Sequence, residues 1–592
     1  MYPRIILLLF FFTLIACQSD QSNTDADPSQ KVYRHSIDGK PSSLDPIQAS
    51  TVYSNFVVLN IFDTLYTYKY LTRPYEVKPN LAAALPEISM DGLRYIIRIK
   101  PGVYFHDHPA FQNGQGRELE AEDFVYSIKR MFDPDMQPAG SWLWQGRIVG
   151  LDDWKAAGSD YAETIEGLKA LDRYSIQITL NKPFPQLLYT LTLGYSAVVP
   201  HEVVMHEGSL FGSKPIGSGP FTLNHLDANK AYLLKHSKFR QEPLDLSAEG
   251  YDEALHAYTG IQTLEGQSPP FVDRLEIHFM TEQTSQWNSF VKGDEIQFAR
   301  VPKDKQNTVI LSKDPFKLHP QILQKYHHSF GTEAAFVYGG FNMDDPNFGQ
   351  TGDPEYDARS KALRCAIRSA HDWKLKNQNF YFGLGTVFPG IIPPMVPEYD
   401  PDIPKDSITT DIKAGRILLQ EAGWHSDNLP TFEYHTSGSV SDRLLFEQMR
   451  GFLKTIDYPQ NKIEYHPYAS FGSFNQAIKN KQAPFFYLAW FLDYPDAENT
   501  LQLFYGPNAS PGSNTFNYKN PEFDRLFKLT KTMQPSEERT ALYQKMNQMI
   551  IDDCVVISGL SRKRIFLWHK NVIMFPDREI LGGAFLRYVD IQ

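Results

Sequence analysis

An acidic residue placed just after a buried strand is the strongest chemical signal in this sequence. Residues 485–491 form a continuous apolar and aromatic run, which is typical of a strand covered on both faces. Asp493 follows almost at once. Ligands of open α/β sheets bind beyond the ends of such strands when the strands are parallel. We therefore expect Asp493 to bind a ligand, and a purely structural role as a cap of a turn is the alternative.

Patterns of catalytic residues are incomplete. The chain has no HExxH and no GxSxG sequence, and residues 217–219, Gly-Ser-Gly, are only a short turn-like fragment. The acidic residues Asp493 and Asp496 could suggest glycoside chemistry, but two carboxylates are weak evidence in a long chain. We expect no catalytic residues, and a secreted hydrolase is the less favoured alternative.

Histidine pairs offer a second alternative. His106 and His108 would share one face of a strand and could bind metal, and His327 and His328 form another pair. Surface or loop positions explain these histidines better, and no Cys/His cluster has zinc-like spacing. We expect no metal site and no cofactor in the protein itself, with a metal chelate or haem as the alternative cargo.

The N-terminus carries a targeting signal. Arg4 precedes an apolar run of residues 5–16, which is too short to span a bilayer but suits a signal peptide. The run ends in Leu-Ile-Ala followed by Cys17, which resembles a bacterial lipobox and implies cleavage before Cys17 and acylation of its thiol. Ordinary cleavage beside an incidental cysteine is the alternative. We expect residues 1–16 to be a signal peptide and residues 17–30 a lipidated, polar tether.

The whole chain has the composition of an ordinary globular protein. It has 592 residues, of which 42% are hydrophobic and 21% charged, and it is too long for a single core. The net charge of −11 argues against nucleic acid as a partner, because phosphate binding needs a basic face. Besides Cys17 there are only Cys365 and Cys554; we expect buried thiols, and a bond between them is left open.

Strand and helix patterns are mixed along the chain. Apolar and polar residues alternate in 93–100, 174–180 and 275–279, as they do in half-buried strands. Residues 120–132 and 411–422 have the apolar spacing of amphipathic helices. Strands interleaved with helices indicate the α/β class.

A series of short motifs stands in a characteristic order. They are Leu44-Asp45-Pro46, Pro79-Asn80-Leu81-Ala82, Lys100-Pro101-Gly102-Val103-Tyr104-Phe105-His106-Asp107, Ala121-Glu122-Asp123-Phe124-Val125-Tyr126-Ser127, Pro200-His201, Ile216-Gly217-Ser218-Gly219-Pro220-Phe221, Phe341-Asn342, Ala422-Gly423-Trp424, Trp490-Phe491-Leu492-Asp493-Tyr494-Pro495 and Phe516-Asn517-Tyr518-Lys519-Asn520-Pro521-Glu522-Phe523-Asp524. In order and spacing they resemble the extracellular solute-binding proteins of family 5, the oligopeptide-, dipeptide- and nickel-binding components of ABC importers. The resemblance runs from about Tyr33 to the C-terminus.

This resemblance implies a two-lobed periplasmic-binding-protein fold of class II, cluster C type. Two α/β lobes would enclose a cleft, with an extra domain inserted in the first lobe. Carried over to this chain, lobe I comprises residues 31–60, 172–292 and 557–592, the extra domain residues 61–171, and lobe II residues 293–556.

The resemblance also implies a set of binding residues. In peptide binders of this family, an aspartate after the tryptophan of the same motif pairs with the α-ammonium of the ligand, and Asp493 holds that position here. Such a charge-assisted hydrogen bond contributes on the order of 1.5–3 kcal/mol. The other implied cleft residues, for each of which simple packing is the alternative, are Trp490, Phe491, Phe471, Ser50, Thr51 and Val52.

The implied function is that of a substrate-binding lipoprotein of an ABC importer. It would capture peptides as an added strand in the cleft, close around them and deliver them to the permease subunits. We expect a monomer at the periplasm or cell surface, held to the membrane by its lipid rather than by a helix. A sensory or adhesion role of the same fold is left open.

One departure from the family pattern concerns the far end of the ligand. Some oligopeptide binders carry an arginine shortly before the tryptophan, and this arginine reaches the carboxylate of the ligand. Here the sequence before Trp490 is Tyr-Leu-Ala. Capture of a free C-terminus is therefore not supported, and the ligand could be longer, amidated or not a peptide.

Overall fold

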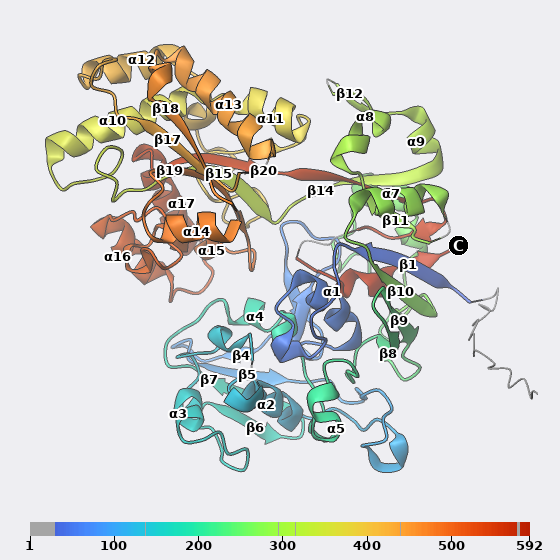
Figure 1. Cartoon of the computed structure of the whole chain (residues 1–592). Coiled ribbons are helices and arrows are strands. Elements are labelled where there is room, and N and C mark those ends of the chain that lie inside the picture. Colours follow the sequence, from blue (N-terminus) through green and yellow to red (C-terminus); the bar gives the residue numbers. More distant parts are fainter. Residues whose placement is uncertain are drawn as a thin grey trace, which may run out of the picture.

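The computed structural model describes residues 30–592, except Gln137, Asp294, Asp314, Ser439, Ser470 and residues 577–579. Its chain forms two α/β lobes and an additional sheet below the first lobe (Figure 1). The fold class is thus the predicted α/β, two-lobed one. The predicted signal peptide and Cys17 lie outside the described residues.

Lobe I is built on a four-stranded sheet with the strand order β1-β10-β9-β8. β1 (Val32–Ile37) pairs in parallel with β10 (Arg274–Phe279), and β10 pairs antiparallel with β9 (Lys230–Lys235). β8 (Phe221–Leu226) completes the sheet on the other side of β9. The alternating pattern at residues 275–279 is confirmed as a strand, β10.

The additional sheet has the order β4-β5-β7-β6, and β4, β5 and most of β6 lie in the residues expected to form the extra domain. Its strands are β4 (Glu87–Ile88), β5 (Arg94–Arg98), β6 (Leu168–Asp172) and β7 (Ser175–Thr179), and α2 (Ala121–Arg130) packs on β6 and β7. Because β7 pairs with both β5 and β6, the sheet continues past the predicted boundary at residue 171. We propose that this domain extends to the end of β7. Its apolar side chains are continuous with the core of lobe I.

Lobe II is built on a six-stranded mixed sheet with the order β16-β20-β15-β19-β17-β18. The strands are β15 (Ala335–Phe341), β16 (Thr386–Val387), β17 (Phe432–Thr436), β18 (Ile463–Pro467), β19 (Phe485–Phe491) and β20 (Val556–Ser561). β19 runs antiparallel to β15 and parallel to β17. The parallel pairing with β17 involves only Phe485 and Phe486, at the start of β19, whereas the antiparallel pairing with β15 runs to Phe491, so the expected parallel neighbour is absent where β19 ends.

Helices cover both faces of the lobe II sheet (Figure 1). The upper group is α10 (Pro354–Ala370), α11 (Trp373–Tyr381), α12 (Ile412–Glu421) and α13 (Val440–Thr455), and the lower group is α14 (Phe471–Lys479), α15 (Glu498–Leu501), α16 (Pro521–Thr530) and α17 (Glu537–Asp552). The prediction that residues 485–491 are covered on both faces is wrong for the end of the strand. Residues 485 and 486 are buried, the next four are half-buried, and Phe491 is 59% exposed.

Two strand crossovers join the lobes. β14 (Tyr326–Thr332) continues into β15, and β20 continues into β21 (Lys563–His569). β21 pairs with β14 on one side and with β11 (Phe298–Arg300) on the other, in a separate three-stranded sheet beside lobe I. The expected boundaries place β11 and β14 in lobe II and most of β20 in lobe I. In the structure, β11 and β14 pair with β21 beside lobe I, and β20 belongs to the lobe II sheet. We propose lobe boundaries at the crossovers, at Glu333 and Arg562.

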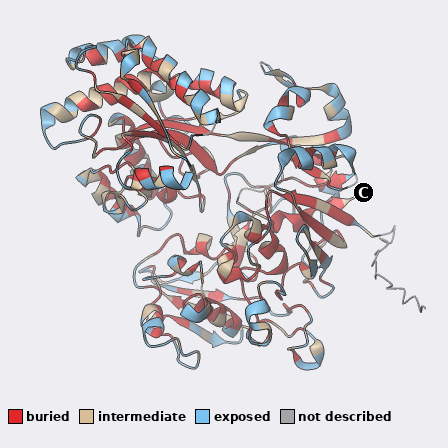
Figure 2. Ribbon diagram, viewed as in Figure 1, coloured by how far each residue is buried: buried red, intermediate tan, exposed pale blue. Residues whose placement is uncertain are grey.

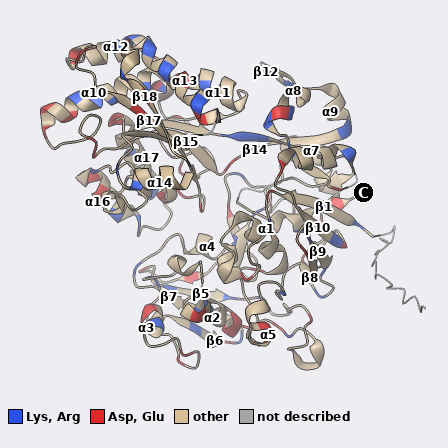
Figure 3. Ribbon diagram, viewed as in Figure 1, with Lys and Arg blue, Asp and Glu red and all other residues tan. Residues whose placement is uncertain are grey.

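The crossovers carry an ion-pair cluster. Glu333 is only 6% exposed, and its side chain accepts hydrogen bonds from the guanidinium groups of Arg562 and Arg564. Its backbone N–H also donates to the carbonyl of Arg562 at 2.9 Å. Figure 3 shows the basic stretch on the strand that crosses between the lobes.

Shorter elements complete the chain. They are β2 (Tyr66–Tyr68), β3 (Val77–Pro79), β12 (Ile310–Lys313), β13 (Phe316–Leu318), β22 (Val572–Ile573), β23 (Asp590–Ile591), α3 (Leu151–Ala156), α4 (Leu187–Thr190), α5 (His201–Glu207), α6 (Glu253–His256), α7 (Gln283–Lys292), α8 (Gln306–Val309) and α9 (Pro320–Lys325). Buried residues concentrate on the sheets, while the outer faces of the helices are exposed (Figure 2). In the part of the chain that the structure describes, no helix combines the length and apolarity needed to cross a membrane.

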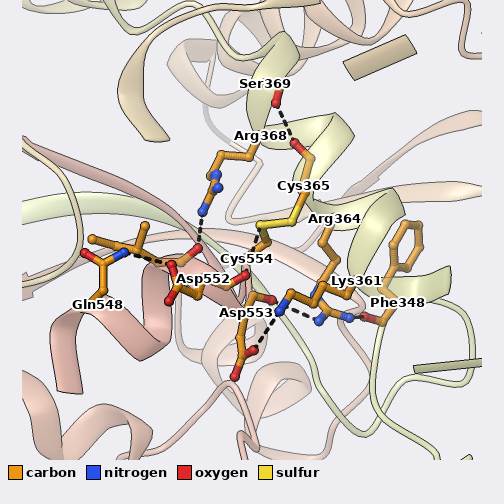
Figure 4. Close-up of a disulfide and its surroundings, with 11 residues drawn as sticks. Phe348, Lys361, Arg364, Cys365, Arg368, Ser369, Gln548, Asp552, Asp553 and Cys554 are labelled. Carbon is orange, nitrogen blue, oxygen red and sulfur yellow. Dashed lines mark hydrogen bonds and ion pairs between the residues drawn. A yellow bond between two sulfur atoms is a disulfide. The ribbon is translucent and has the colours of Figure 1, made fainter. Parts of the chain in front are cut away.

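A disulfide joins Cys365 of α10 to Cys554, just after α17 (Figure 4). The expectation of two free thiols is therefore wrong, and the bond that the sequence left open is present. Polar contacts lie on either side of the bond. Arg364 Nη2 donates to the carbonyl of Asp553 at 3.0 Å, and Arg368 donates to the carbonyl of Ile551. The disulfide and these contacts fasten α10 to the C-terminal end of α17.

Candidate ligand-binding site

One buried amide organises the end of β19. Asn499, in α15, is fully buried. Its side-chain oxygen accepts hydrogen bonds from Trp490 Nε1 at 2.9 Å and from the backbone N–H of Asp493 at 3.3 Å. Its Nδ2 donates to Asp493 Oδ2 at 3.0 Å. The structure thus brings two predicted residues together through a third that was not predicted, because nothing in the sequence shows that α15 folds back on β19.

The Asp493 carboxylate lies in partly dehydrated surroundings. Asp493 is exposed to solvent, yet protein atoms around its carboxylate displace enough water to raise the pKa of Asp493 above its ordinary value. The hydrogen bond from Asn499 acts in the opposite direction and stabilises the charged form. A ligand cation would find a carboxylate that is already oriented and that lacks full hydration.

Asp493 also acts on a tyrosine outside its own lobe. Burial raises the pKa of Tyr195, and the negative charge of Asp493 raises it further. Tyr195 belongs to the 3-10 turn η5 (Gly194–Ser196), which packs on the turn η1 (Pro46–Gln48) and on α1 (Val52–Ile61). The carboxylate therefore lies within electrostatic reach of a surface formed by lobe I.

The three predicted residues of lobe I stand at the start of α1. Thr51 is the N-cap of this helix, and its Oγ1 accepts a hydrogen bond from the backbone N–H of Ser54 at 3.1 Å. Ser50 is exposed, and Val52 is 76% exposed. These positions present free surface next to the segment that carries Tyr195, while the Thr51 side chain is occupied by capping.

A tyrosine pair connects the two lobes beside Asp493. The ring of Tyr189, in α4, stacks on the ring of Tyr494 with centroids 5.7 Å apart and planes 2° apart. The Tyr494 hydroxyl donates to Glu498 Oε2 at 2.6 Å. This contact fixes the segment after Asp493 against the first half of the chain.

Asp496 has a structural position. It is 1% exposed, and its Oδ2 accepts a hydrogen bond from Arg539 Nη2 at 2.7 Å. The same Arg539 nitrogen donates to Glu398 at 2.9 Å. Burial, together with the charge of Asp496, raises the pKa of Glu398 to about 7, against the opposing effect of Arg539. Asp493 and Asp496 therefore do not form an open acidic pair of the kind that glycoside hydrolysis needs.

The remaining predicted aromatic residues occupy different surfaces. Alternation along β19 directs Phe491 to the opposite face from Trp490, and the guanidinium of Arg562 lies 5.7 Å from the centre of the Phe491 ring. Phe471, at the start of α14, is 62% exposed and contacts Phe474 of its own helix. Exposed large apolar side chains of this kind on both lobes are suited to being covered by a ligand or by lobe closure.

A cavity of about 910 Å³ lies beside the crossover strands. Residues of lobe I, of the crossover strands and of lobe II line it, among them Arg73, Tyr75, His328, Phe330, Met395 and Phe566. None of the seven predicted binding residues lines this cavity. This concave site is therefore separate from the Trp490–Asp493 segment.

The two histidines of each predicted pair have different surroundings. His106 is fully buried, its Nε2 lies 3.0 Å from the carbonyl oxygen of Gly219, and its ring contacts His236. His108 instead lies 3.2 Å from Glu207. His327 packs on Trp568, and only its neighbour His328 lines the cavity at the crossovers.

Two α/β lobes, joined by crossing strands and carrying polar and aromatic side chains where they approach each other, define a two-lobed solute-binding protein. The family model "Bacterial extracellular solute-binding proteins, family 5 Middle" matches residues 76–512, and the chain belongs to this family. Its members are substrate-binding proteins of the extracellular or periplasmic space, as the resemblance predicted.

The relatives that the chain resembles are named for different ligands. The chain is 24% identical to heme-binding protein A of Haemophilus influenzae over 80% of this chain and 77% of that protein. It is 22% identical to di/tripeptide-binding protein 1 of Pseudomonas aeruginosa over 89% and 88%. The structure of DppA from Helicobacter pylori in complex with the peptide STSA superposes with a TM-score of 0.65 at 20% identity, over 95% of this chain and 98% of that one.

Proposed function

We propose that this protein is the peptide-binding lipoprotein of an ABC importer. It captures peptides between its lobes and delivers them to membrane permease subunits, as a monomer anchored through the lipid on Cys17. Family membership and the peptide-binding relatives support this proposal. The Cys365–Cys554 disulfide supports export, because such bonds persist in oxidising compartments.

The arrangement of Asp493 is the observation that carries the proposal. Asn499 holds the carboxylate next to Trp490, and the carboxylate acts on Tyr195 of lobe I. A peptide bound as an added strand offers the same main-chain groups whatever its sequence, so one fixed charge can set its register. We propose that Asp493 pairs with the α-ammonium of the peptide, that Trp490, Phe491, Phe471 and Val52 cover its length, and that Ser50 and Thr51 offer backbone groups.

A substitution of Asp493 tests this pairing. We expect Asp493→Ala to weaken binding of short synthetic peptides at least tenfold, a loss of about 1.4 kcal/mol or more, because the ammonium loses its charged partner. Calorimetric titration of wild type and variant measures the change. N-acetylated versions of the same peptides should bind both proteins equally weakly, because they carry no ammonium group.

A matched control keeps the result specific. Glu447 is an exposed acid of α13 that pairs with Arg443, away from the end of β19, and Glu447→Ala should leave peptide affinity unchanged. If Asp493→Ala binds free and acetylated peptides as wild type does, Asp493 is not part of the site. Peptide binding by the wild type would then have to rest on other residues.

A larger apolar cargo is the second candidate. The cavity beside the crossover strands has an aromatic lining and includes His328, and one relative is named a heme-binding protein. Native mass spectrometry of protein purified without denaturation separates the two candidates. Heterogeneous short peptides would support the first function, whereas a single porphyrin-sized mass would support the second.

A further inference from the structure

The tripeptide Glu-Tyr-His occurs twice in lobe II, at residues 433–435 in β17 and at residues 464–466 in β18. These two strands are parallel neighbours, and their register places the two glutamates opposite each other and the two histidines opposite each other. Residues two apart in a strand share a face. Two imidazoles and two carboxylates therefore stand together on one face of the sheet.

The distances between these side chains are those of a nearly assembled ligand set. His435 Nε2 lies 3.1 Å and His466 Nε2 3.9 Å from Glu433 Oε2, and His466 Nε2 lies 3.2 Å from Glu464 Oε2. The ligand atoms of Glu433, His435 and His466 all lie within 4.8 Å of one another. Ligands of tetrahedral zinc, bound at about 2.0–2.2 Å, are separated by roughly 3.3 Å, so small side-chain movements suffice.

The surroundings of His435 suit a metal ligand. His435 is 4% exposed. The Tyr468 hydroxyl lies 3.0 Å from His435 Nδ1, where its oxygen can accept a hydrogen bond from Nδ1–H and leave Nε2 free for a metal. The Glu433 and His466 side chains remain 37% and 38% exposed, which gives an ion access from solvent.

A second cluster of possible metal ligands lies in the first half of the chain. His108, His206 and Glu207 also come together, but Lys214 Nζ lies 3.3 Å from Glu207 and competes with a metal for its charge. Among the residues that the structure describes, neither Glu433 nor Glu464 forms an ion pair with a lysine or an arginine. The β17–β18 cluster thus combines metal ligands with uncompensated negative charge.

We propose that Glu433, His435 and His466, assisted by Glu464, form a binding site for a divalent transition metal such as Zn²⁺. Two imidazoles and carboxylate oxygens match the ligand preference of Zn²⁺, Ni²⁺ and Cu²⁺ rather than that of Mg²⁺. The metal would fasten the edge strand β18 to β17, just before the chain enters α14. The site is distinct from the Trp490–Asp493 end of the proposed cargo site, because His435 pairs with Phe486, four residues or about 13 Å along β19 from Trp490.

Titration of untagged, full-length mature protein with Zn²⁺ tests this proposal, with calorimetry for affinity and native mass spectrometry for stoichiometry. We expect one high-affinity Zn²⁺ per chain and no comparable binding of Mg²⁺. His466→Gln should weaken Zn²⁺ binding at least tenfold, and Tyr468→Phe should weaken it roughly tenfold through loss of the partner of His435. The matched control His206→Gln should bind Zn²⁺ as wild type does.

Two outcomes would overturn the proposal: full Zn²⁺ affinity in His466→Gln, or loss of Zn²⁺ binding in His206→Gln. Should His466→Gln fail to fold, judged by circular dichroism, Glu433→Gln replaces it with the same expectation. Substitution of Co²⁺ for Zn²⁺ gives an independent readout, since coordinated imidazole produces visible absorption bands that the His466 variant should lack. Wild-type spectra without such bands would contradict the site as well.

Discussion

Asp493 presents a carboxylate whose surroundings oppose its ionisation, while Asn499 holds it in one orientation. In the free protein, partial dehydration of its carboxylate raises the pKa of Asp493 above the ordinary value of 3.8. A bound ammonium would lower it again, because an opposite charge favours the ionised form. Proton binding and peptide binding therefore compete at Asp493, so protonation of Asp493 weakens peptide binding.

This competition predicts a pH dependence of peptide affinity. The free protein takes up a proton at Asp493 that the complex cannot hold, so the dissociation constant should rise as the pH falls. The rise should begin above pH 3.8, where Asp493 starts to protonate, and should approach at most tenfold per pH unit. Titrations between pH 7.5 and pH 4 measure it, and Asp493→Asn should show a flat and weak profile.

The same raised pKa has a consequence for stability. A carboxyl whose folded pKa lies above its unfolded pKa stabilises the fold at low pH, and this contribution disappears as the pH rises through the folded value. At neutral pH the ionised Asp493 therefore costs the unliganded protein some stability. Asp493→Asn should melt no lower than wild type at pH 7.5, and a clearly lower melting temperature would assign Asp493 a structural role instead.

At the scale of elements, the connection between α10 and the end of α17 is the clearest structural device in lobe II (Figure 4). The Cys365–Cys554 bond links positions 189 residues apart. Cys554 is fully buried, and the arginines of α10 bind carbonyl groups next to it. Because β20 and the crossover to lobe I begin directly after Cys554, this connection also anchors the start of the crossover.

Removal of this disulfide should destabilise the protein without weakening its cargo binding. For Cys365→Ala combined with Cys554→Ala we expect a loss of about 2–5 kcal/mol in unfolding free energy, because a long loop is no longer closed in the unfolded chain. Denaturant unfolding of the oxidised wild type and the double variant measures it. Peptide affinity at 20 °C should stay within about twofold of wild type, since neither cysteine lies in the proposed site. Equal stability of the two proteins would contradict a structural disulfide.

At the scale of the whole molecule, two crossing strands and the Tyr189–Tyr494 stack connect the lobes. Apolar residues on both sides, Val52, Phe471 and Phe491, are more than half exposed. Glu333, on the first crossover, binds Arg562 and Arg564 on the second crossover. These contacts hold the two strands together where they pass from one lobe to the other. This construction permits rotation of the lobes about the crossovers.

A cargo that contacts both lobes should favour a closed arrangement. We expect saturating peptide to reduce the radius of gyration measured by small-angle X-ray scattering toward the value of about 25 Å typical of a compact chain of this length. Asp493→Ala at the same peptide concentration should keep the larger value, because it remains largely unbound. An unchanged radius for the wild type, with binding confirmed by calorimetry, would show that cargo is held without closure.

Much of the fold follows from local patterns. The alternating segments became β5, β7 and β10, and the amphipathic segments became α2 and α12, within a few residues of the expected ends. Periodicity succeeds here because each element buries one face on a sheet or a core. Membership of those elements in a lobe is not local information, and β11 and β14 pair with β21 from the far end of the chain.

The sequence alone determined the family, the α/β class and the candidate carboxylate, because ordered motifs and side-chain periodicity are properties of the chain itself. Only the tertiary structure decided which side chains meet. Asn499 reaches Trp490 and Asp493 through a turn, Cys365 meets Cys554 across 189 residues, and strand register sets two distant Glu-Tyr-His segments side by side. The physical reason is that contacts between distant segments depend on how sheets pair and helices pack, and a one-residue change of register would turn every side chain of a strand to the other face.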